Sequence, residues 1–191
     1  NRNKATRYAE ELQSYQATLE ERVEAQTKKI KAQALERIRM QESVIEGMAA
    51  IIESRDNSTG EHVRNTKRYV TMMADYMLEN NIYPDIVDEK FTVYIRNAAP
   101  LHDVGKILIS DLILNKPARF TPDEFEIIKT HAFLGGDIVE NILAGNAEPE
   151  LLQMAKEIVC CHHEKWDGSG YPMGLRGSEI PLSARIMAVA D

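Results

Sequence analysis

The first quarter of the chain is a run of strong helix formers. Residues 2–54 contain no proline and a single glycine, Gly47, and they are rich in Ala, Glu, Gln, Lys, Arg and Leu. These residue types cost the least free energy in a helix, whereas proline interrupts one. The segment therefore predicts one long helix. Because most of its surface is polar, such a helix needs a partner to be stable.

An apolar seam follows one side of this expected helix. Its members recur at spacings of three, four, four, seven and eight residues: Leu12, Tyr15, Leu19, Val23, Ile30 and Ile38. This is close to a heptad repeat with a stutter after Leu19. We therefore expect residues 1–54 to be a coiled-coil helix that joins two copies as a parallel homodimer. A helix folded back against its own domain is the alternative.

Residues 55–191 form the second expected domain. The segment Ser54-Arg-Asp-Asn-Ser-Thr-Gly60 is rich in turn residues and marks the junction. Helical spacing then returns over residues 62–78, 86–101, 121–129, 131–143, 149–163 and 183–191. No strand-like alternation of useful length occurs. The fold class is therefore predicted to be all-α, with a long N-terminal helix followed by a helical domain.

Charge and composition narrow the classes of function. The net charge of −7 argues against a protein that binds long nucleic acid, which requires a basic surface. Cys160 and Cys161 are the only cysteines, offer no disulfide framework and fit a reducing compartment, where we expect them to pack as small apolar groups. The longest apolar stretch, residues 44–52, is too short to span a bilayer. We expect a cytoplasmic fragment with a sensor domain or a membrane anchor upstream of Asn1.

Histidines and aspartates fall at the expected helix ends and loops, from which side chains can reach a common site. They are His62, His102, Asp103, His131, His162, His163 and Asp191. Imidazole and carboxylate ligands without paired thiolates suit divalent iron, manganese or zinc. With one carboxylate shared between two ions, seven ligands supply about four contacts to each. Two such ions activate water and stabilise the charge of a phosphoryl group, so the pattern predicts hydrolysis of a phosphodiester.

Longer motifs surround these residues. They are His102-Asp-Val-Gly-Lys106, Lys116-Pro117, His131, the segment from His162-His-Glu-Lys-Trp to Gly170-Tyr-Pro172, and Gly174-Leu-Arg-Gly177. Together they closely resemble the HD-GYP branch of the HD superfamily of metal-dependent phosphohydrolases, over about residues 51–191. The resemblance implies an all-helical HD-type domain that hydrolyses the bacterial second messenger cyclic di-GMP at a centre of two or three iron or manganese ions.

The resemblance also implies a role for each ligand. His62, His102, Asp103 and Asp191 would hold one ion, while Asp103, His131, His162 and His163 would hold the other. Lys106 would act with Asp103 in catalysis, because a compact ammonium suits a phosphate oxygen.

Substrate contacts are expected from a glycine-rich loop and its surroundings. Gly170, Tyr171 and Pro172 form the naming motif, whose glycine and proline fix the backbone near the metals. A purely structural role for this motif is the alternative. Arg176 and Arg185 could each hold a phosphate or a guanine edge, or a salt bridge. Trp166 could stack on a base or anchor the loop.

The chain departs from the family pattern at two positions. Members with three ions carry a glutamate four residues before the first histidine, where this sequence has Ser58, so we expect two ions. Family domains also continue beyond the aspartate that matches Asp191, so we expect the fragment to lack C-terminal helices, with Asp191 frayed and metal affinity reduced. The predicted function is a cyclic di-GMP phosphodiesterase. The alternatives are a hydrolase of another cyclic dinucleotide or guanosine nucleotide, and an inactive domain that binds a ligand or a partner.

Overall fold

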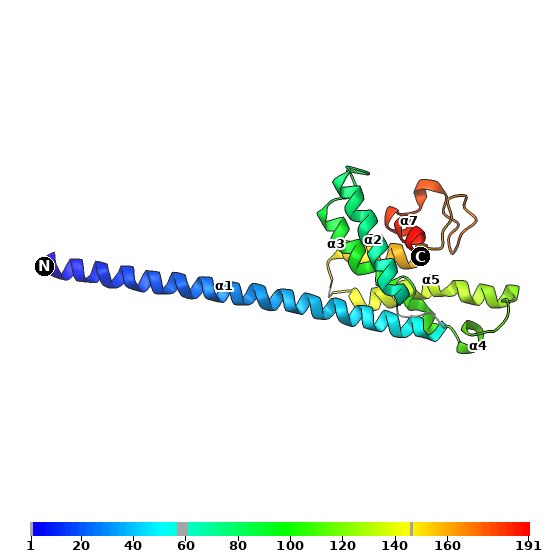
Figure 1. Ribbon diagram of the computed structural model, residues 1–191, viewed down its shortest axis with the longest axis horizontal. Coiled ribbons are helices and arrows are strands. Elements are labelled where there is room, and N and C mark those ends of the chain that lie inside the picture. The colour runs from blue at the N-terminus through cyan, green and yellow to red at the C-terminus, as the bar shows by residue number, and fades with distance from the viewer. Residues whose placement is uncertain (1, 57–60, 146) are drawn as a thin grey trace. The chain divides into compact units, whose positions relative to one another are not determined.

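The computed structural model of the chain describes residues 2–56, 61–145 and 147–191, which are mostly helical, with no strand among them (Figure 1). Ser58 lies outside the described residues. The all-α prediction is confirmed. The α-helices are α1 (Arg2–Glu53), α2 (Glu61–Glu79), α3 (Glu89–Ala98), α4 (Asp111–Leu114), α5 (Pro122–Leu143), α6 (Pro149–Cys161) and α7 (Leu182–Ala190). Short 3-10 helices lie between them: η1 (Ser54–Asp56), η2 (Ala99–Leu101), η3 (Val104–Leu108) and η4 (Gly177–Glu179). The chain divides into two compact units, Asn1–Ser43 and Val44–Asp191.

Helix α1 is continuous, as its composition predicts. The seam side chains from Leu12 to Ile38 are exposed to solvent in the single chain. Toward the C-terminal end of α1 the environment changes, because Ala49, Ile52 and Glu53 are buried within the second unit. The coiled coil stays a prediction. No helix in the described ranges is long and apolar enough to cross a membrane.

Helix starts in the second unit follow their capping residues. The Thr121 hydroxyl accepts a hydrogen bond from the backbone N–H of Glu124, whose carboxylate accepts one from the Thr121 N–H, which completes a capping box at the start of α5. Helix α3 begins at Glu89, later than the predicted residue 86, because the Asp88 carboxylate accepts from the N–H of Phe91.

The prediction of two helices over residues 121–129 and 131–143 is wrong. Helix α5 is unbroken, and the Thr130 hydroxyl donates to the carbonyl of Ile127 inside it. A β-branched residue lowers helix propensity only slightly, and this internal hydrogen bond satisfies its polar group. His131 consequently lies in the middle of a helix, which gives it a rigid support.

The core of the second unit lies between α2, α3, α6 and α7, while α5 packs along α6 and against η3 (Figure 1). Its fully buried members include Val70, Ile95, Ile158 and Met187. Contact between η3 and α5 is close because Gly105 has no side chain to hold the two backbones apart. This packing places the chain that follows His102 directly against the turn of α5 that carries His131.

Candidate metal centre

Side chains from five parts of the second unit meet at one place. His62 lies in the first turn of α2, and His102 and Asp103 lie between η2 and η3. His131 comes from α5, His162 and His163 follow α6, and Asp191 follows α7. Ring centroids of neighbouring histidines lie 4.0–5.6 Å apart, and His62 Nε2 lies 3.0 Å from Asp191 Oδ1. The structure therefore brings together all seven predicted ligand residues.

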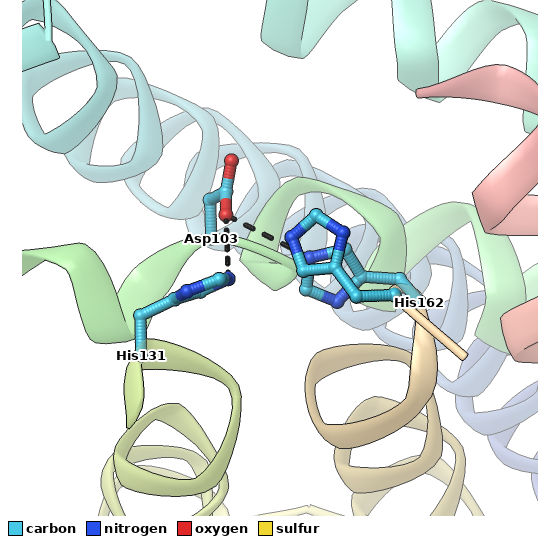
Figure 2. A group of neighbouring side chains, drawn as sticks. Asp103, His131 and His162 are labelled. Atoms are coloured by element: carbon cyan, nitrogen blue, oxygen red, sulfur yellow. Dashed lines mark ion pairs between the residues drawn. The ribbon is translucent and has the colours of Figure 1, made fainter. Parts of the chain in front are cut away.

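Asp103 lies at the centre of this group. Its Oδ1 is 3.2 Å from His131 Nε2 and 3.7 Å from His162 Nε2 (Figure 2). Its Oδ2 is 3.3 Å from His102 Nε2 and 2.8 Å from Lys106 Nζ. The two oxygens of one carboxylate therefore face different histidines, the arrangement in which an aspartate can serve two ions.

A second carboxylate that sequence reasoning missed completes the side near His62. Glu53 Oε1 lies 3.6 Å from His62 Nε2 and 3.7 Å from His102 Nε2. Asp191 Oδ1 lies 3.5 Å from the same His102 nitrogen. Glu53 is the last residue of α1, and it is 2% exposed. The sequence feature that could have indicated its burial is helical spacing. Glu53 follows Ala49 by four residues, so the two side chains lie on the same buried face of the helix.

The backbone sets which ring nitrogens can bind a cation. The Nδ1 atoms of His102, His131 and His162 lie 3.0, 2.7 and 3.0 Å from the carbonyl oxygens of Ala99, Ile128 and Ile158. A carbonyl oxygen only accepts hydrogen bonds, so each Nδ1 carries the hydrogen and each neutral ring presents a lone pair at Nε2.

Those Nε2 lone pairs converge on an acceptor. Among the described residues, the Nε2 atoms of His102, His131 and His162 and Asp103 Oδ1 are buried and have no hydrogen-bond partner. Buried acceptors that face one another are costly unless a cation lies between them. The donor atoms of Asp103, His131, His162 and His163 lie within 4.8 Å of one another, as do those of Glu53, His62 and His102. The cluster therefore fits a divalent metal ion, and its backbone-held rings are typical of metal ligands.

The protein environment shifts the pKa values of the histidines in different directions. Burial lowers the pKa of His162, and it lowers the pKa of His163 to about 3. Burial would also lower the pKa of His102, but contact with Asp103 and Asp191 raises it to about 10. Burial opposes ionisation of Asp103, yet three neighbouring histidines hold its pKa well below the usual value. His162 and His163 are therefore neutral at pH 7 and able to bind a metal.

The two remaining carboxylates differ in pKa. Burial raises the pKa of Glu53, whereas for Asp191 the hydrogen bond with His102 outweighs burial and lowers the pKa to about 2. The sequence had led us to expect a frayed terminus, but Asp191 contacts His62 and His102 in the structure.

The loop after α6 brings the Gly-Tyr-Pro segment to the centre. The buried Glu164 carboxylate accepts hydrogen bonds from the N–H groups of residues 173, 174 and 175, at 2.7, 3.1 and 3.0 Å. A Cβ on Gly170 would lie 2.3 Å from the backbone nitrogen of Lys165, so only glycine fits. Tyr171 donates its N–H to the His163 carbonyl, and its ring centroid lies 4.7 Å from that of His163. The organising role of Glu164 was not predicted.

The other candidate residues lie around this loop. The Arg185 guanidinium stacks 5.6 Å from the Tyr83 ring and 5.8 Å from the Trp166 ring. Arg176 is exposed, and its backbone N–H donates to the Glu179 carboxylate. Pro172 follows Tyr171 through a cis peptide bond.

The cysteines are free, and Cys161 is buried. Burial raises the pKa of Cys161 to about 12 and also raises that of Cys160. Both are therefore protonated near pH 7, as expected of packed thiols rather than metal ligands.

Comparison with known proteins identifies the fold family. A family model described as an HD domain matches residues 46–191. A probable cyclic di-GMP phosphodiesterase of Vibrio cholerae is 47% identical over 155 residues, which cover 80% of this chain and 35% of the relative. A cyclic di-GMP phosphodiesterase of Thermotoga maritima is 43% identical over 148 residues, covering 78% of this chain and 37% of the relative.

The name of a third relative gives a different nucleotide as its substrate. This relative is the 3'3'-cGAMP-specific phosphodiesterase 2 of Vibrio cholerae, 40% identical over 148 residues that cover 78% of this chain and 26% of the relative. The chain thus spans between about a quarter and just over a third of the length of these three relatives. The family match and these identities confirm the resemblance found in the motifs: the chain belongs to the HD domain family, in its HD-GYP branch.

Proposed function

We propose that the chain is the catalytic domain of a metal-dependent phosphodiesterase that hydrolyses cyclic di-GMP in bacterial signalling. The single observation that carries the proposal is the placement of Asp103, whose two oxygens face different histidines with free Nε2 lone pairs. The printed names of the relatives support the substrate.

Two divalent ions, of iron or manganese, are the proposed cofactors. One would be held by His62, His102, Asp103 and Asp191, and the other by Asp103, His131, His162 and His163. When bound, such ions supply activation of water and stabilisation of phosphoryl charge. The backbone carbonyls of residues 99, 128 and 158 keep three of these rings in the tautomer that can bind.

The chain's other groups would hold the substrate. Lys106 Nζ lies beside Asp103 Oδ2, where an ammonium can neutralise a phosphate oxygen during the reaction. Tyr171 lies against His163, so the Gly170–Pro172 segment would form one wall of the substrate site. Arg176 and Arg185 are proposed as more distant contacts, and Arg185 with Trp166 offers a flat surface suited to a guanine base.

There are two alternatives to this proposal. The first keeps the metal-dependent hydrolysis but changes the substrate, and the second has no catalytic activity. The name of the 40% identical relative favours a second candidate substrate, the mixed cyclic dinucleotide 3'3'-cGAMP. Other guanosine nucleotides are the wider version of this alternative. In the second alternative the domain is inactive and binds a ligand or a partner protein; the complete set of donor residues argues against it.

A metal and turnover assay tests the proposal. The chain would be purified without oxygen, loaded with Fe²⁺ or Mn²⁺, and incubated with cyclic di-GMP, 3'3'-cGAMP and guanosine tetraphosphate. We expect two ions per chain, preferential hydrolysis of cyclic di-GMP, and loss of both metal and turnover in Asp103→Ala. Full activity of that variant, or a wild type that binds no transition metal, would reject the proposal.

The N-terminal helix is proposed to form a parallel coiled coil with a second copy. Support comes from its exposed apolar seam, which in a single chain leaves Leu12, Val23 and Ile30 in water. The homodimer would relay a signal from an upstream sensor or receiver domain in the cytoplasm. Light scattering should give the mass of a dimer for the chain and of a monomer for the double variant Val23→Glu/Ile30→Glu.

A further inference from the structure

We infer that Glu53 is a direct ligand of the ion held by His62 and His102, so that the last residue of α1 is part of the metal centre. The inference rests on the proposed function, since it requires that centre. The carboxylate oxygen lies 3.6 and 3.7 Å from the two Nε2 atoms. One small cation could therefore contact all three donors, which lie within 4.8 Å of one another.

The burial of Glu53 supports a ligand role. A glutamate is rarely buried to the extent of Glu53, which is 2% exposed, because removal of a carboxylate from water is costly without a compensating charge. The nearby carboxylates of Asp103 and Asp191 add negative charge to the same place. Three carboxylates close together attract a divalent cation to this place.

The two distances are too long for direct hydrogen bonds between Glu53 and the rings. His102 Nδ1 donates to the Ala99 carbonyl, so Nε2 is the ring nitrogen that faces Glu53. Separations of 3.6 and 3.7 Å exceed the length of a hydrogen bond, but they suit two donors that contact one small cation.

Glu53 would complete the donor set of that ion. Together with His62, His102, Asp103 and Asp191 it would give the ion five protein donors.

The chain just after Glu53 is fixed to the other side of the centre. Arg55 donates to the carbonyls of Lys106, Ile107 and Ile109 at 3.2, 2.9 and 3.1 Å and to the Asp111 carboxylate at 2.7 Å. These bonds hold the end of α1 against η3, which carries Lys106. Metal affinity would therefore depend on the seating of the end of α1.

The test compares Glu53→Gln with Glu36→Gln, the same change at an exposed position of the same helix. Bound Mn²⁺ would be counted by mass spectrometry, and affinities measured by competition with a chelator. We expect two ions in the wild type and in Glu36→Gln. In Glu53→Gln we expect one ion to bind at least about tenfold more weakly while the other is unchanged.

Unfolding of the same variants in urea provides a second readout. Without metal, Glu53→Gln should be as stable as the wild type or more so, because a buried charge is removed. With metal, its stabilisation should be smaller by about 1.4 kcal/mol for each tenfold loss of affinity. A Glu53→Gln chain that binds both ions as tightly as the wild type overturns the inference alone. A wild type that binds no ion overturns the proposed function as well.

Discussion

Replacement of Gly105 by alanine should disable the metal centre without touching a ligand. An ideal Cβ at this position would lie 1.9 Å from the His131 carbonyl oxygen and 2.7 Å from the Gly135 backbone nitrogen. Both are backbone atoms and cannot rotate away. Ordinary contact begins near 3.4 Å, so η3 and α5 would have to separate by about 1.5 Å.

That separation acts directly on the centre. Asp103 lies on one side of the contact and His131 on the other, with 3.2 Å between Oδ1 and Nε2. Metal–ligand distances tolerate only about 0.2 Å of change. We therefore expect a loss of Mn²⁺ affinity of at least about tenfold, together with a loss of about 1–3 kcal/mol in the free energy of unfolding.

Chelator competition and urea denaturation measure the two effects. Gly47→Ala is the matched control, because the added Cβ near the C-terminal end of α1 would meet no atom within 4 Å outside the neighbouring backbone of that helix. It should stabilise the chain by about 0.5–1 kcal/mol and leave metal binding unchanged. Wild-type affinity and stability in Gly105→Ala would show that the close approach of η3 to α5 is not required.

Three further predictions concern the same region. Because burial holds the pKa of His162 and His163 below the unfolded value near 6.5, the unfolded chain binds more protons at low pH. The metal-free protein should therefore lose up to about 1.4 kcal/mol per pH unit for each ring as the pH falls below 6.5. Urea titrations between pH 4 and 7 check this, and a flat profile would contradict it. Lys106→Met should lower kcat by about a hundredfold while both ions stay bound, which turnover by the metal-loaded variant measures; an unchanged kcat would exclude a role in catalysis. Glu164→Gln should cost about 1.5–3 kcal/mol and speed amide hydrogen exchange at residues 173–175, whereas unchanged protection there would refute its role in the loop.

Local patterns in the sequence were sufficient for part of this structure. Helix α1 follows from its composition, and the start of α5 follows from Thr121 and Glu124, because capping depends on residues three positions apart. Six of the seven predicted ligand residues lie at or beside helix ends that face one site, whereas His131 lies within α5. The break predicted before His131 failed because a histidine with a possible function does not interrupt a helix.

The missed residues depend on contacts between distant parts of the chain. Glu53 is one of many acids in a charged helix, and only packing against α2 and the turn before η3 distinguishes it. Arg55 bonds to residues more than fifty positions away. Glu164 stands inside a recognised motif, but the N–H groups it binds become visible only when the loop is folded.

The proposed ligand set reaches from Glu53 to Asp191, and its members lie in or next to α1, α2, η3, α5, α6 and α7. If any one of these segments unfolded, a bound ion would lose the donor atoms that the segment supplies. An ion that binds only the assembled set adds RT ln(1 + [L]/Kd) to the stability of the whole unit. Metal binding would therefore require the complete folded domain. A proteolytically cleaved or partly folded copy in the cell would bind no metal and would have no activity, rather than reduced activity.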